Sequence, residues 1–67
     1  MSVAKVTEIT SMSTVSFEDA IRQGIARASK TLDDIKGAWI KEQKIVCDGE
    51  NIVGFRVDMK VTFVLKD

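Results

Sequence analysis

The segment from Phe55 to Leu65 alternates between large apolar residues and more polar ones, and this pattern constrains the fold more than any other feature. A period of two over eleven residues predicts a long β-strand with one buried face and one more exposed face. The residues that alternate with polar neighbours are Phe55, Val57, Met59, Val61, Phe63 and Leu65.

A chain this short needs a source of stability beyond its own hydrophobic core. Its 67 residues form one domain, residues 1–67, and a domain of this size buries only about 60% of its unfolded surface. Cys47 is the only cysteine and there is no histidine, so an intrachain disulfide is excluded and the usual zinc and copper sites are disfavoured. Oligomerisation remains as the expected source of stability.

Charge and hydropathy exclude several classes of partner. Ten basic and ten acidic residues cancel, so the field that draws proteins to nucleic acid is missing. No stretch approaches the run of about 18 apolar residues that a membrane span needs. The first ten residues contain no apolar core of a secretory signal. Together with the single free thiol, these features predict a cytoplasmic protein.

Hydrophobic periodicity and turn residues divide the chain into four elements. Ser16 is the expected helix N-cap, with Ser13 as a second candidate, and the segment 11–14 is expected to be a loop. Asp48-Gly49 is a turn signal. The predicted elements are a strand over Ser2–Thr10, a helix over Phe17–Leu32, and strands over Ile35–Cys47 and Asn51–Leu65.

The order of these elements predicts an α+β fold. The last two strands form a hairpin, and a right-handed crossover through the helix places the third strand between the other two. The sheet is therefore expected to be antiparallel, in the order 1-3-2. A helix of sixteen residues spans roughly 24 Å, whereas a strand of thirteen residues spans roughly 43 Å. The uncovered strand ends, and the second sheet face with Trp39 and Ile45, are expected to meet other subunits.

No constellation of residues indicates an enzyme. Cys47 has no histidine to activate it, and no phosphate-cradling glycine loop is present. Asp33-Asp34 is interpreted as a polar step at the helix end, and the Asp48–Asn51 segment as a solvated turn that matches no calcium loop. The sequence predicts neither catalytic nor metal-ligating residues.

Trp39 and Arg56 are the candidates for a binding role. On an uncovered sheet face, Trp39 could anchor a subunit interface or stack on a planar ligand. Arg56 is expected on the same face, where it could bond a carbonyl group, stack on an aromatic ring or pair with a carboxylate. The interface anchor and the ion pair are the more common outcomes for these residue types.

Four stretches together resemble the dodecin family, and the resemblance covers nearly the whole chain. They are KVTEI (5–9), SFEDAI (16–21), ARASKTL (26–32) and FRVDMKVTF (55–63). The resemblance implies a β-α-β-β subunit whose sheet wraps the helix, and a hollow homododecamer. It also implies a non-enzymatic protein that binds a flavin, such as riboflavin, FMN or lumichrome, between subunits. In the family a tryptophan stacks on the flavin ring and a glutamine bonds its polar edge.

This chain departs from the family pattern at both of those positions. An ungapped count places Gly37 where the family has tryptophan and Arg56 where it has glutamine. Arginine only donates hydrogen bonds, so it cannot replace the glutamine amide, which offers a donor and an acceptor side by side. Trp39, about 7 Å along the strand from Gly37, could stack on a shifted ligand or fill the vacated pocket. The predicted cofactor-binding residues are thus Gly37 and Arg56, at the family's positions, and Trp39, from its place on the same face. The alternative is a dodecin-like assembly that has lost flavin and serves as a scaffold or binds ions or another metabolite.

Overall fold

The computed structural model describes residues 3–65, which form three strands and one helix. They are β1 (Ala4–Ser13), α1 (Phe17–Ala28), β2 (Ile35–Asp48) and β3 (Asn51–Val64). The sheet order is β1-β3-β2, with both pairings antiparallel. This confirms the predicted α+β subunit and its strand order. Ser2, which was included in the predicted first strand, lies outside the described residues.

The sequence around Ser16 fixes the start of α1. The Ser16 hydroxyl accepts a hydrogen bond from the Asp19 backbone N–H at 2.9 Å, which confirms the predicted N-cap. Glu18 and Asp19 occupy the first turn and Arg27 the last, and both placements suit the helix dipole. Ser13 does not cap the helix. Its hydroxyl accepts from the Val15 N–H at 2.9 Å and shapes the preceding turn instead.

The predicted helix end at Leu32 is wrong, because α1 ends at Ala28. The Ser29 hydroxyl bonds the Ala26 carbonyl at 2.8 Å, and the Thr31 N–H bonds the Ala28 carbonyl at 3.1 Å. Such short-range bonds from serine and threonine segments compete with continued helix. Leu32 still packs against the core from the turn that follows.

The predicted loop over residues 11–14 is also partly wrong, because β1 continues to Ser13. Met12 pairs with Arg56 and Ser13 with Phe55, so the long β3 supplies partners beyond Thr10. The small Ser11 suits its position, since its Cβ would lie only 3.0 Å from a Cβ placed on Gly24 of α1. Pairing and close packing thus outweigh the polar character of this segment.

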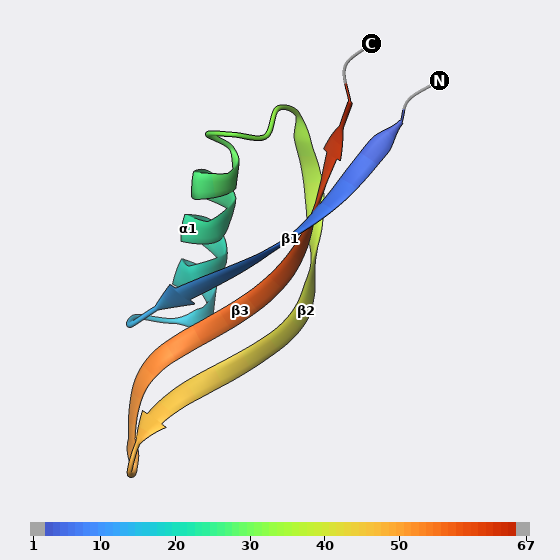
Figure 1. Ribbon diagram of the computed structural model, residues 1–67. Coiled ribbons are helices and arrows are strands. Elements are labelled where there is room, and N and C mark those ends of the chain that lie inside the picture. The colour runs from blue at the N-terminus through green and yellow to red at the C-terminus, as the bar shows by residue number, and fades with distance from the viewer. Residues whose placement is uncertain (1–2, 66–67) are drawn as a thin grey trace.

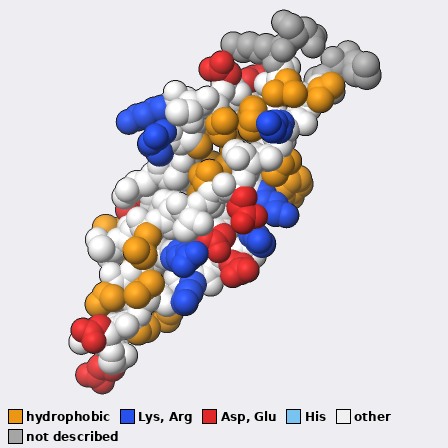
Figure 2. All heavy atoms as spheres, in the orientation of Figure 1, with side chains coloured by type: hydrophobic (Ala, Val, Ile, Leu, Met, Phe, Trp, Pro, Cys, Tyr) orange, Lys and Arg blue, Asp and Glu red, His pale blue; other side chains and the backbone are white. Residues whose placement is uncertain are grey.

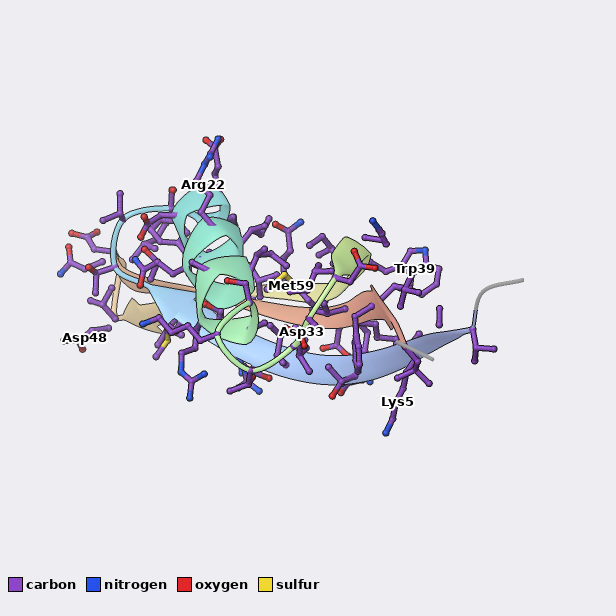
Figure 3. All side chains as sticks on the ribbon, turned by 90° about the horizontal axis from the view of Figure 1, so that it is seen from above. Lys5, Arg22, Asp33, Trp39, Asp48 and Met59 are labelled. Atoms are coloured by element: carbon purple, nitrogen blue, oxygen red, sulfur yellow. The ribbon has the colours of Figure 1, made fainter. Side chains whose placement is uncertain are left out.

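The buried residues of β3 form the centre of the core, which confirms the middle of the predicted alternation, but the strand ends at Val64 and Leu65 is 44% exposed. Val57, Met59 and Val61 are fully buried with Ala20 of α1, and Figure 3 shows Met59 beside the helix. Phe17 and Phe55 meet edge to face, with ring centroids 5.2 Å apart. The residues packed around this centre are Ile9, Ile21, Ile25, Leu32 and Ile35.

The helix is too short to cover the sheet on which it packs. α1 has 12 residues, or roughly 18 Å, whereas β2 and β3 have 14 residues each, or roughly 46 Å. The described subunit measures 51 × 19 × 13 Å, and both ends of the sheet extend past α1 (Figure 1). The large hydrophobic residues left exposed are Val3, Val6, Met12, Val15, Trp39, Ile40, Ile45, Ile52, Val53 and Leu65.

A bulge in β2 changes which residues share a face. The register against β3 shifts between Ile40 and Glu42, and such an extra residue reverses the alternation that follows it. Ile45 consequently pairs with Phe55 and faces the helix side, whereas Trp39 pairs with Lys60 on the opposite face. The prediction that Trp39 and Ile45 share a face is therefore wrong.

Candidate functional site

The sheet face that points away from α1, called the outer face below, carries all three predicted site residues. On β3, outward residues alternate with the buried Val57, Met59 and Val61, and their cross-strand partners lie on the same face. Figure 3 shows Trp39 on the side of the sheet away from the helix. The outward residues of β2 and β3 used below are Gly37, Trp39, Glu42, Lys44, Val46, Gly54, Arg56, Asp58, Lys60 and Thr62.

Trp39 stands next to an open position on this face. Its side chain is 62% exposed, and Gly37, two residues earlier, pairs with Thr62. A Cβ atom on Gly37 would meet nothing within 4 Å. The ring of Trp39 is therefore accessible, and the open surface beside it at Gly37 has room for a planar group.

Arg56 forms an ion pair within its own chain. Its Nε donates to Asp58 Oδ1 at 3.4 Å, and the same oxygen accepts from the Thr10 hydroxyl at 3.0 Å. The Arg56 side chain remains 46% exposed. The carboxylate pairing expected from the sequence is thus present, and the guanidinium still has surface available for another group.

One subunit does not bring the three predicted residues into a single pocket. Trp39 lies opposite Lys60, four residues from Arg56 along β3, which corresponds to roughly 13 Å. Gly37 lies opposite Thr62, six residues from Arg56, or roughly 20 Å. On one subunit, these three residues are therefore spread along the outer face rather than clustered at one point.

Two charged residues near Arg56 were missed by the sequence reasoning. Glu42 and Lys44 join Arg56 and Asp58 in lining a hollow of about 240 Å³ on the outer face. Simple alternation along β2 assigned Glu42 and Lys44 to the face opposite Trp39. Only the bulge before Glu42 brings them to the same side. No residue in that segment predicts a bulge.

A second hollow lies between α1 and β1, and the sequence reasoning did not predict it. Its volume is about 510 Å³. Hydroxyl, amide and apolar side chains and one guanidinium line it. The lining residues are Thr7, Ile9, Thr10, Ser11, Gln23, Gly24, Arg27, Ala28, Thr31 and Leu32.

Acidic and sulfur ligands do not gather into a metal site within the subunit. Among residues 3–65, no three histidine, cysteine, aspartate or glutamate residues lie close enough together to hold an ion. In the same part of the chain, no helix has the length and apolar character needed to span a membrane.

Comparison with known proteins gives consistent matches over nearly the whole chain. The family model named Dodecin matches residues 3–66. The calcium dodecin of Mycobacterium tuberculosis is 33% identical over 66 residues, which make up 98% of this chain and 93% of that protein.

Solved structures agree with these matches. A dodecin from Streptomyces davaonensis has a TM-score of 0.93 at 33% identity, covering 98% of this chain and 97% of that chain. A Thermus thermophilus dodecin variant has a TM-score of 0.94 at 28% identity, with both chains fully covered. The crystal structure of the Mycobacterium tuberculosis calcium dodecin, described as having a novel calcium-binding site, has a TM-score of 0.82 at 31% identity, covering 96% of this chain and 91% of that chain.

Proposed function

The chain belongs to the dodecin family, and on that premise we propose that it is a non-enzymatic binding protein that assembles as a hollow homododecamer. Its ligand is a flavin, or a similar planar small molecule, held between subunits. The observation that carries the proposal is the exposed Trp39 beside the unfilled position at Gly37, on a sheet face that the helix leaves open.

The exposed hydrophobic residues support the assembly. A monomer of 67 residues has little stability to spare, yet Trp39, Met12 and Ile52 are each more than half exposed. In Figure 2, hydrophobic side chains stand exposed along the visible face, including near both of its ends, and charged side chains are interspersed among them. Contacts between subunits would bury these ends and supply the missing stabilisation.

The spacing of the site residues supports a location between subunits. Trp39 offers a ring for stacking, and Arg56 offers donors for a carbonyl-bearing edge. Roughly 13 Å separates them along the sheet, and a flavin held between subunits would contact Trp39 of one subunit and Arg56 of another. Both residues keep exposed surface for this purpose.

The second candidate function is an assembly that has lost flavin and serves as a scaffold or binds ions or another metabolite. Gly37 lacks the family's stacking ring, and Arg56 is occupied by Asp58. A relative is named calcium dodecin, but the described part of this subunit has no cluster of three acidic residues for an ion. An ion site would therefore need oxygen ligands from several subunits.

The cellular setting is part of the same proposal. A cytoplasmic location accords with the exposed free thiol of Cys47, which a reducing compartment would preserve. The zero net charge accords with a small molecule, rather than nucleic acid, as the partner.

Riboflavin titration tests the ligand. Trp39 is the only tryptophan, so quenching of its fluorescence at micromolar riboflavin reports stacking directly. Calorimetry should show that Trp39→Phe keeps part of the affinity and that Trp39→Ala loses at least tenfold, the equivalent of about 1.4 kcal/mol. Absence of both quenching and heat in the wild-type protein would favour the flavin-free assembly.

Light scattering tests the assembly separately. The expected mass is about twelve times the 7.4 kDa of the chain. A folded monomer in dilute buffer would overturn the proposed shell, whatever the result with riboflavin.

A further inference from the structure

Like charges lie directly opposite each other in two neighbouring rows on the outer face. In the ladder between β2 and β3, Lys44 pairs with Arg56, and Glu42 pairs with Asp58. Like charges in such positions destabilise a sheet. Within the subunit, the Arg56–Asp58 ion pair at 3.4 Å offsets part of this repulsion. Within residues 3–65, neither Glu42 nor Lys44 forms an ion pair with an opposite charge on the neighbouring strand, so a partner with the complementary arrangement would stabilise both rows.

The two rows form one balanced patch. Within each strand the signs alternate, since Lys44 follows Glu42 by two residues and Asp58 follows Arg56 by two. The row of cations and the row of anions are therefore roughly 7 Å apart, and all four side chains line the same hollow of about 240 Å³. The patch has no net charge, but its positive side chains lie in one row and its negative side chains in the next.

Two copies of this patch related by a two-fold axis attract each other. When two copies meet face to face about an axis that runs across the strands, between the rows, each row of cations faces the other copy's row of anions. An isologous contact needs this kind of self-complementary surface. An axis along the strands would instead place cations against cations and anions against anions. The charges therefore favour the arrangement in which the strands of the two copies run antiparallel.

We propose that Glu42, Lys44, Arg56 and Asp58 form a self-complementary charge patch through which two copies of this chain dock their outer faces about a two-fold axis. In this contact, Lys44 and Arg56 lie against Glu42 and Asp58 of the partner subunit. The proposal rests on the homo-oligomeric function proposed above and adds the surface and the orientation of one of its contacts.

The neighbouring rows fit the same arrangement. The next outward row toward the strand ends contains Trp39 and Lys60, and the next row toward the hairpin tip contains Val46 and Gly54. The rotation that matches the charges sets these two rows against each other. Trp39 then faces the partner subunit's Val46, so the exposed ring meets an apolar surface, or a planar ligand held against one.

Charge-swap variants test this geometry. Lys44→Glu with Arg56→Glu gives an all-acidic patch, and Glu42→Lys with Asp58→Lys gives an all-basic patch. Each variant alone is expected to lose the full assembly and to sediment as a smaller species at low salt. Mixing the two in equal amounts should restore the large species, because acidic patches then face basic ones.

The matched control carries all four substitutions. This inverted patch keeps the zero net charge and remains self-complementary, so it should assemble like the wild type. Circular dichroism checks that each variant is folded. Folded half-swapped variants that keep the wild-type mass, or a folded inverted variant that does not assemble, would overturn the proposal.

Salt dependence of the unmodified protein gives a second measurement that does not depend on any variant. The Debye length, over which salt screens charges, falls from about 14 Å at 0.05 M salt to about 4 Å at 0.5 M salt. The concentration at which the assembly dissociates should therefore rise by about tenfold or more over this range. No change would overturn the charge patch while leaving the shell intact, whereas a monomeric wild type would overturn the shell itself.

Discussion

Gly24 of α1 lies so close to Met59 of β3 that a Cβ atom on Gly24 would stand 2.6 Å from the Met59 Cε atom. Ser11 of β1 limits the same position from the other side, with its Cβ at 3.0 Å. Gly24 and Met59 are both buried. A side chain at Gly24 would have to displace the Met59 methyl group and press against Ser11, so glycine suits this close approach of the helix to the sheet.

Gly24→Ala is expected to destabilise the protein, although alanine favours helix. The better helix propensity contributes about 1 kcal/mol, but overpacking a close-packed core costs about 1–3 kcal/mol. We expect a net loss of about 1 kcal/mol, measured by denaturant unfolding at fixed protein concentration. Adding Met59→Leu, which removes the Cε atom, should recover part of the loss. A gain in stability for Gly24→Ala alone would contradict this interpretation.

The N-cap at Ser16 gives a prediction with an internal control. Ser16→Ala removes the acceptor for the Asp19 N–H and should cost about 1 kcal/mol of unfolding free energy. Ser16→Asp keeps an acceptor at the same place and adds a charge that suits the dipole. It should unfold at nearly the wild-type denaturant concentration. Equal losses for both substitutions would point to packing rather than capping.

Gly49 is the residue with a positive φ in the loop between β2 and β3, with a value of 64°. Nothing lies within 4 Å of a Cβ placed there, so any cost of substitution comes from the backbone alone. Gly49→Ala should cost about 1–2 kcal/mol. Gly49→Asn should cost less, because asparagine tolerates this conformation. Thermal unfolding of the pair at equal concentration checks the order, and equal losses would contradict it.

Most of the fold could be predicted because its determinants are local or periodic. The alternation around Met59 identified the core strand, Ser16 identified the helix start, and Asp48-Gly49 identified the hairpin. The errors arose where contacts between elements determine the boundaries of a strand or helix. Ser11 and Met12 belong to β1 because β3 provides partners for them.

The candidate site was only partly predictable for a related reason. Trp39 and Arg56 could be assigned to one face from short-range alternation near each of them. Glu42 and Lys44 could not, since one extra residue at the bulge before Glu42 reverses the pattern and leaves no mark in the sequence. The large separation between Trp39 and Arg56 likewise depends on the pairing register, which no single strand specifies.

The open surface at Gly37 allows a tryptophan to be introduced at the position where the family has its stacking ring. A Cβ there would meet nothing within 4 Å, so Gly37→Trp should fold as the wild type does within the subunit. Burying one large aromatic side chain against a ligand contributes roughly 1.5–3 kcal/mol. Riboflavin affinity measured by calorimetry should therefore rise by about ten- to a hundredfold.

Gly37→Ala is the matched control for that substitution, because it changes the backbone freedom at residue 37 without adding a ring. Its riboflavin affinity should equal that of the wild type, and light scattering should give both variants the wild-type mass. If Gly37→Trp assembles normally but binds riboflavin no better than Gly37→Ala, then residue 37 does not border the ligand. In that case the interpretation of Trp39 as a shifted stacking partner loses its geometric basis, because Trp39 projects from the same face only two residues away.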